Sequence, residues 1–199
     1  MTPANWFVGL IVPSEGWFDQ IERVPPGARY FHPDDLHIMI SFLGAVEEED
    51  ARRAWSLARR LTGGPFEFPL GPVEPMGSPR TAQSWGIVPE GPVLALNEFL
   101  AIYRNDIAQA ARARHDLRPP NPVIQVASAR RKTSPAERSA IARWAEMTDV
   151  PERTLLLNEV GLYTWSEEDN QRRFQIVERF KLPPYDPSAW PKRYSLRYT

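Results

Sequence analysis

Proline is the residue that most limits what this chain can fold into, because 21 of its 199 residues are proline. A proline ring fixes φ and removes one backbone N–H donor, so prolines favour loops and the ends of helices and strands. The prolines stand in small groups along the whole sequence, for example within residues 25–26, 65–79, 119–120 and 183–184. The sequence therefore predicts short helices and strands separated by stiff loops.

The chain contains no cysteine, which excludes a disulfide scaffold, a thiol nucleophile and a zinc site with sulfur ligands. Its 24 Lys and Arg residues against 25 Asp and Glu residues give a formal net charge of −1. This balance argues against a general polyanion binder, although a local basic patch remains open. The apolar run at residues 6–12 is too short to span a bilayer and lacks the flanks of a signal peptide. We therefore expect a cytoplasmic protein.

Hydrophobic periodicity predicts two similar series of strands and helices. The expected strands cover residues 6–12, 36–44, 66–70, 83–88, 123–128, 155–165 and 173–182, and the expected helices cover residues 15–22, 47–61, 94–114 and a segment that opens at residues 134–137. Ser134 and Glu137 have the spacing of a capping box. Residues 72–79 are expected to form a stiff loop. This order predicts an α+β fold with two similar halves and largely antiparallel sheets.

Signatures of the common nucleotide-binding, zinc-protease and hydrolase sites are absent from the sequence. One segment is chemically suggestive: residues 36–44 read Leu-His-Ile-Met-Ile-Ser-Phe-Leu-Gly. In a regular strand, side chains alternate between the two faces. The predicted faces are Leu36, Ile38, Ile40 and Phe42 on one side, and His37, Met39 and Ser41 on the other.

This segment resembles the first of two His-x-Thr/Ser-x motifs of the 2H phosphoesterase superfamily, which includes the bacterial 2′-5′ RNA ligase-like RNA 2′,3′-cyclic phosphodiesterases. The family's first motif typically reads Asn-Leu-His, an apolar residue, Thr, an apolar residue, any residue, Phe-Leu-Gly. The resemblance extends over about residues 6–182, including the acidic opening of the helix after Gly44 and the closing hairpin. It implies two pseudo-symmetric lobes, each a mainly antiparallel sheet with helices on its outer face, and a groove between the lobes.

The resemblance also implies a chemistry. In the family one histidine acts as general base and the other as general acid, while the Thr or Ser hydroxyls hold phosphate oxygens. The implied ligand is a nucleotide or RNA end with a 2′,3′-cyclic phosphate or a 2′-5′ linkage. No metal, no organic cofactor and no membrane are implied.

The chain departs from this pattern at three of the four signature positions. Met39 stands at the first Thr/Ser position. The second motif aligns best with residues 122–128, which puts Val123 at the second histidine and Gln125 at the second Thr/Ser. Val123 has no proton to transfer, whereas Gln125 can still donate to a phosphate oxygen. The candidate site is His37 as the catalytic residue, with Met39, Ser41, Val123, Gln125 and Arg130 as ligand contacts.

Each candidate also has an ordinary structural interpretation. His37 fits a polar residue on a half-buried strand, and the basic group at residues 130–132 fits a solvated loop. Trp85, Tyr163 and Trp165 are candidates for base stacking. The apolar neighbours of Trp85 and Tyr163 favour core packing for both, and Trp165 is left open.

Three hypotheses follow from these residues. The first is a divergent 2H phosphoesterase-like protein that holds a phosphate-bearing ligand in the groove but has lost two-histidine catalysis. The second is an active cyclic phosphodiesterase that pairs His37 with a replacement acid or base, such as His115 or a water held by Gln125. The third is a non-catalytic interaction module that docks a partner through the proline- and aromatic-rich tail, residues 183–199, which follows one bilobal domain at residues 1–182.

Overall fold

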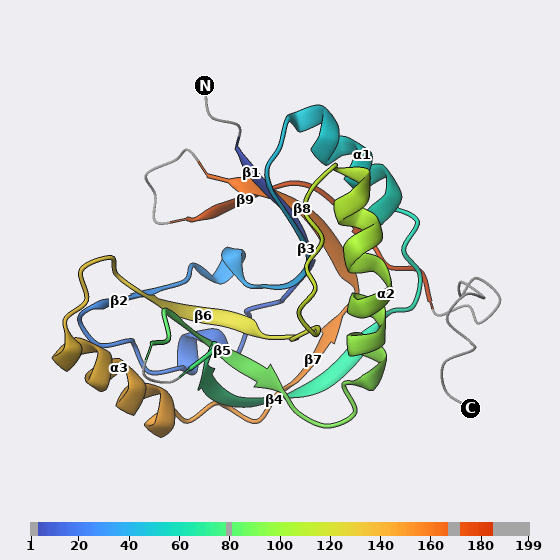
Figure 1. The fold of residues 1–199 in the computed structure, drawn as a ribbon. Coiled ribbons are helices and arrows are strands. Elements are labelled where there is room, and N and C mark those ends of the chain that lie inside the picture. The colour runs from blue at the N-terminus through green and yellow to red at the C-terminus, as the bar shows by residue number, and fades with distance from the viewer. Residues whose placement is uncertain (1–3, 79–80, 167–171, 185–199) are drawn as a thin grey trace.

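The computed structural model of the chain describes residues 4–78, 81–166 and 172–184 (Figure 1). The strands are β1 (Asn5–Ile11), β2 (Ala28–Tyr30), β3 (His37–Ala45), β4 (Phe66–Pro75), β5 (Ser84–Pro89), β6 (Ile124–Ala129), β7 (Thr154–Leu157), β8 (Glu159–Trp165) and β9 (Phe174–Lys181). The α-helices are α1 (Glu48–Ala58), α2 (Leu94–Ala110) and α3 (Pro135–Met147), and the 3-10 helices are η1 (Phe18–Gln20) and η2 (Pro33–Asp35). Among these described helices, none has the length and apolar character needed to cross a membrane.

The strands form one curled antiparallel sheet in the order β7-β4-β5-β6-β3-β1-β8-β9, and β2 pairs with β6 beside this path. One lobe holds β3, β1, β8 and β9, with α1 and α2 packed on β1 and β3 (Figure 1). The other lobe holds β2, β4, β5, β6 and β7, with α3 packed on β4. The lobes join where Ile38 of β3 pairs with Ile124 of β6. The predicted α+β architecture with two lobes is confirmed.

A β-bulge in β3 decides which of its side chains reach the groove face. Val8 of β1 pairs with Ser41, and the next residue of β1 pairs with Met39, so Ile40 is an extra residue. Beyond this point the predicted alternation is wrong. Phe42 is 55% exposed, whereas Ser41 is fully buried and its hydroxyl donates to the Arg104 carbonyl oxygen of α2 at 2.8 Å.

The predicted stiff loop at residues 72–79 is also wrong in its first half, because β4 continues to Pro75. The pairing of β4 with β7 ends at Pro69, and from Val73 to Pro75 the strand pairs with β5. A strand with a partner on one side tolerates prolines whose missing N–H would point to the other side. Edge geometry therefore explains why prolines occur here inside a strand.

Three further predicted elements differ from the structure. The expected strand at residues 155–165 is interrupted at Asn158, because β7 pairs with β4 in one lobe and β8 pairs with β1 in the other. The expected helix at residues 15–22 contains only η1, and the short strand β2 has no counterpart among the predicted elements. The capping box of Ser134 and Glu137 is confirmed at the start of α3. Residues 185–199 of the predicted tail lie outside the described residues.

Gly86 of β5 lies directly against Val123, and this contact carries a testable prediction. A Cβ built at Gly86 would come within 2.2 Å of Val123 Cγ1 and 2.8 Å of the Ile124 carbonyl oxygen. We expect Gly86→Ala to lower the free energy of unfolding by about 1–3 kcal/mol through overpacking. Urea unfolding measures this loss, and Val123→Ala in the same chain should recover part of it. An unchanged unfolding midpoint for Gly86→Ala would contradict the packing.

Candidate functional site

The two motif segments lie on neighbouring strands and share one face of the sheet. Ile38 and Ile124 pair with each other, and both are fully buried. Because side chains alternate along a strand, the residues on either side of this pair point to the opposite face. The residues on that face, called the groove face below, are His37 and Met39 on β3, Gln125 on β6, and Val123, which directly precedes β6.

The predicted contacts on the groove face differ widely in accessibility. His37 is 6% exposed, Val123 is 8% exposed and Met39 is 37% exposed. Gln125 is half-buried. Ser41 lies on the other face, where its hydroxyl is committed to α2, so the structure corrects its predicted position.

His37 is held in one tautomer by its own turn. Its Nδ1 lies 2.7 Å from the backbone carbonyl oxygen of Asp35, which can only accept a hydrogen bond. Nδ1 therefore carries the proton in the neutral ring, and Nε2 is left as an acceptor. Burial lowers the pKa of His37 to about 4. At neutral pH this imidazole is therefore uncharged, can accept a hydrogen bond through Nε2, and carries no second proton to donate as an acid.

Aromatic rings enclose His37. Its ring centroid lies 4.6 Å from Phe7, 5.3 Å from Tyr163 and 5.4 Å from Phe174. Gly9 lies beneath the imidazole, with a built Cβ only 3.5 Å from its Cδ2. The Tyr163 hydroxyl is buried with no hydrogen-bond partner in the described part of the chain, and burial raises its pKa.

The predicted packing of the two inner aromatics is confirmed. Tyr163 is fully buried and Trp85 is 2% exposed. Trp165, which the sequence left open, is 45% exposed. Of the three stacking candidates, Trp165 therefore offers an accessible ring.

Asp35 ties the start of β9 to the turn that precedes His37. Its carboxylate is 1% exposed and accepts the backbone N–H groups of Arg173 at 2.6 Å and of Phe174 at 3.4 Å. The Arg172 Nε also lies 3.6 Å from Asp35 Oδ1. These contacts place Phe174 over the imidazole, so one buried carboxylate closes the aromatic enclosure.

Cationic side chains gather beside this turn. The Arg173 guanidinium carbon lies 5.4 Å from the Phe31 ring centroid and 5.9 Å from the Trp165 centroid. Burial and the nearby Arg29 lower the pKa of Arg173. Arg130 is exposed, and its Nε donates to the Ala28 carbonyl oxygen at 3.3 Å.

Sequence reasoning missed Asp35, Arg173 and Arg29 as neighbours of the site. A signal was present, since an acidic pair precedes the first motif and two arginines precede the last strand. Their encounter depends on the strand order β3-β1-β8-β9, which brings the start of β9 near η2. No local sequence pattern indicates that the start of β9 lies near η2.

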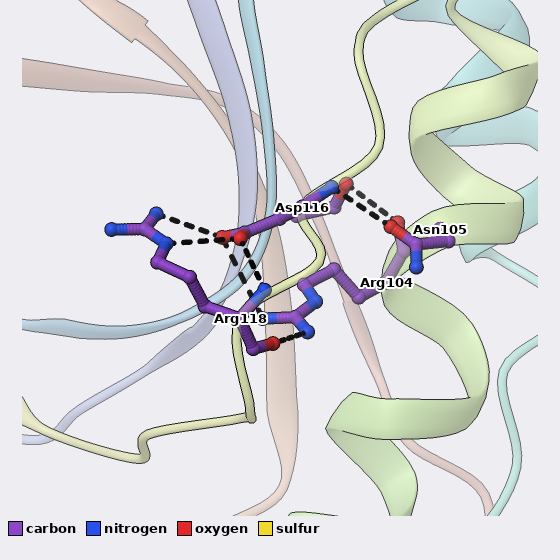
Figure 2. Close-up of polar contacts among 5 residues, drawn as sticks. Arg104, Asn105, Asp116 and Arg118 are labelled. Carbon is purple, nitrogen blue, oxygen red and sulfur yellow. Dashed lines mark hydrogen bonds and ion pairs between the residues drawn. The ribbon is translucent and has the colours of Figure 1, made fainter.

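The segment that carries His115 is attached to α2. Figure 2 shows the Asn105 side chain accepting the Asp116 backbone N–H at 3.1 Å. The Asp116 carboxylate in turn accepts from Arg118, and Arg104 donates to the Arg118 carbonyl oxygen. Because Arg104 contacts Ser41 on the face away from His37, these bonds connect the segment to the helix layer.

No group of three or more His, Cys, Asp or Glu side chains that could hold a metal ion occurs among residues 4–78, 81–166 and 172–184.

The lowered pKa of His37 predicts a pH-dependent stability. The unfolded chain takes up a proton near the ordinary pKa of 6.5, whereas the folded chain does so only near 4. The contribution of His37 to the free energy of unfolding is therefore complete above the unfolded-state pKa of 6.5, and it is lost as the pH drops towards 4. Between about pH 7.5 and about pH 5 we expect His37 to account for a loss of about 2 kcal/mol.

Urea unfolding of the wild type and of His37→Gln at both pH values isolates this contribution. The variant should lose less stability on acidification, and the exposed-residue control His115→Gln should behave like the wild type. Equal losses in the wild type and in His37→Gln would rule out a buried neutral imidazole.

The buried contacts of Asp35 predict a large stability difference between neighbouring carboxylates. Asp35→Asn removes a buried charge partner of Arg172 and should cost about 3 kcal/mol of unfolding free energy. Asp34→Asn is the matched control, because Asp34 has a side chain that is 60% exposed and lies 3.5 Å from the same arginine. It should cost less than about 1 kcal/mol. Similar losses in both variants, measured by urea unfolding, would contradict the role of Asp35.

Comparison with known proteins bears on the fold. No protein-family model and no curated protein matches the sequence. E. coli LigT in complex with 3′-AMP is 20% identical, with a TM-score of 0.67 over 90% of this chain and 98% of that chain. A phosphoesterase is 19% identical, with a TM-score of 0.64 over 90% of this chain and 99% of that chain.

A protein of Thermus thermophilus is 17% identical, with a TM-score of 0.65 over 92% of this chain and 100% of that chain. At these identities the likeness concerns the fold. The chain therefore has the fold of LigT over nearly its whole length, as the resemblance of residues 36–44 implied.

Proposed function

We propose that this protein binds a nucleotide or RNA-end phosphate on the groove face and has lost the two-histidine catalysis of 2H phosphoesterases. One observation carries the proposal: the paired motif strands present one imidazole, that of His37, beside Met39, Val123 and Gln125. The strand pairing supports the motif alignment. Ile38 pairs with Ile124, and His37 and Val123 each directly precede one of these two isoleucines in the sequence.

The ligand class follows from the structural neighbour. E. coli LigT has been crystallised in complex with 3′-AMP, with ATP, with NADP+ and with phosphate. Each of these ligands carries a phosphate, and all but phosphate itself carry a nucleoside. Gln125 has an amide that can donate to a phosphate oxygen, and His37 Nε2 can accept from a ribose hydroxyl.

The loss of catalysis follows from the proton transfers that the reaction requires. Opening a cyclic phosphate needs one group to remove a proton from the nucleophile and another to protonate the leaving oxygen. His37 can take a proton through Nε2, but its Nδ1–H is committed to the Asp35 carbonyl. The side chains of Met39 and Val123 cannot donate one in return. A missing general acid typically costs about 10²–10⁴-fold in rate.

The two other hypotheses have less support. An active enzyme that uses His115 would need this exposed side chain on the groove face, but the bonds of the adjoining Asp116 lead to α2. An interaction module that uses the tail depends on residues 185–199, which lie outside the described residues.

Hydrolysis of 2′,3′-cyclic nucleotides and of an RNA with a 2′,3′-cyclic end tests the proposal. We expect no multiple turnover by the wild type, together with a rise in melting temperature on adding 3′-AMP. Installing the family's residues as Met39→Thr, Val123→His and Gln125→Thr in one chain should produce turnover that disappears with His37→Ala. Turnover by the wild type that His37→Ala abolishes would overturn the loss of catalysis.

A further inference from the structure

Two adjoining hollows lie beside the turn that carries His37. A broad open hollow of about 1290 Å³ is lined by residues between Ser14 and Pro33 and by Arg130. Arg23 and Arg29 also line it. An adjoining small cleft is lined by Arg29, Tyr30, Phe31, His32, Asp35 and Arg173. Arg29 belongs to both, so the hollow and the cleft form one continuous surface, called the arginine cleft below.

Backbone pairing places two of these arginines together. In the ladder of β2 with β6, Arg29 pairs with Ser128, and the preceding residue pairs with Ala129. Arg130 follows directly, and its backbone N–H donates to the Gly27 carbonyl oxygen at 2.9 Å. The two guanidinium groups therefore project from neighbouring strands at the same end of the second lobe.

The third cation comes from the other lobe. Arg173 precedes β9, and its backbone is fixed by the Asp35 carboxylate. Its guanidinium lies over the rings of Phe31 and Trp165. Each of these rings leaves the cation its charge and its in-plane donors for a ligand. The arginine cleft thus gathers cations from both lobes.

Carboxylates also lie near the cleft, and the Asp34 carboxylate is 3.7 Å from His32 Nδ1 at its rim. Glu15 and Asp19 line the part of the hollow that is formed by residues 14–24. Asp35 is buried, and its oxygens face two backbone N–H groups and Arg172. Among the described residues that line the hollow and the cleft, the four arginines are Arg23, Arg29, Arg130 and Arg173, and the three acids are Glu15, Asp19 and the buried Asp35.

His32 adds a directed donor at the rim. Its Nδ1 accepts the Asp34 backbone N–H at 3.2 Å, so the proton of the neutral ring resides on Nε2. The side chain is 33% exposed and lines both the hollow and the cleft. An Nε2–H beside arginines is a suitable partner for a phosphate oxygen.

A row of rings connects the arginine cleft to the groove face. Phe174 lies 5.4 Å from the His37 ring, 6.3 Å from Phe31 and 6.0 Å from Trp165, measured between centroids. Asp35 contributes its carbonyl to His37 and also lines the cleft. Cations that alternate with stacking rings are the usual design of sites for single-stranded nucleic acid.

We propose that the arginine cleft binds the phosphodiester backbone of single-stranded RNA, next to the RNA end on the groove face. Arg29, Arg130 and Arg173 contact backbone phosphates, and the exposed ring of Trp165 stacks on a base. This inference rests on the proposed function and names its ligand: an oligoribonucleotide whose backbone reaches beyond the terminal phosphate.

Fluorescence anisotropy with a labelled five-nucleotide RNA that ends in a 3′-phosphate tests this cleft, with 3′-AMP binding measured in parallel by calorimetry. Arg29→Gln and Arg173→Gln should each weaken RNA binding about tenfold, because each removes a charge-assisted bond to phosphate. Each should also reduce the slope of log affinity against log salt by roughly 0.7. The affinity for 3′-AMP should change less than about twofold.

Arg60→Gln is the matched control, because Arg60 is exposed just after α1 and its loss changes the net charge equally. It should leave RNA affinity unchanged within about twofold, and circular dichroism should show all variants folded. Equal weakening by Arg60→Gln, or no weakening by Arg29→Gln and Arg173→Gln, would overturn the proposal that the arginine cleft binds RNA. Binding of 3′-AMP in the same samples would still support the proposed function. Absence of both RNA and 3′-AMP binding in the wild type would overturn the proposed function itself.

Discussion

The pairing of Ile38 with Ile124 is the contact on which the site depends. Both isoleucines are fully buried where β3 and β6 bring the two lobes together. The antiparallel register across this pair places His37 beside Gln125 and Met39 beside Val123. The histidine position of each motif therefore neighbours the Thr/Ser position of the other motif. A slip of β6 by one residue against β3 would turn Val123 and Gln125 away from His37 and Met39, so the composition of the site depends on this one pair.

His37 shows how enclosure changes the chemistry available to one residue. The Asp35 carbonyl fixes the tautomer, and the Asp35 carboxylate brings Phe174 over the ring. Water is thereby removed from around the imidazole, and burial lowers its pKa to about 4. Loss of hydration favours the neutral form and disfavours protonation, so at neutral pH the ring is a hydrogen-bond acceptor at Nε2 and only a weak base. One residue, Asp35, thus holds the tautomer through its carbonyl and the position of Phe174 through its carboxylate.

Most strands and helices could be predicted because hydrophobic periodicity is a local property of the sequence. The two motif segments could be predicted because the spacing of their residues is also local. The sequence could not predict the bulge at Ile40, which depends on pairing with β1 and moves Ser41 to the helix side. It misplaced the prolines of β4, since their tolerance depends on where β7 ends. It missed Asp35 and Arg173, whose contact spans 138 residues of sequence. In each case the missing information is which strands become neighbours.

Binding and catalysis place different demands on this site. Arginines and aromatic rings hold a phosphate and a base with similar strength before and during a reaction, so they raise affinity without lowering the barrier from the bound state. Acceleration requires groups whose interactions strengthen as the proton moves. The side chains of Met39 and Val123 have no proton to transfer, whereas the arginines line the arginine cleft beside them and the ring of Trp165 lies 5.9 Å from Arg173. Under the proposed function, the affinity for an RNA end would therefore not depend on the residues that proton transfer needs.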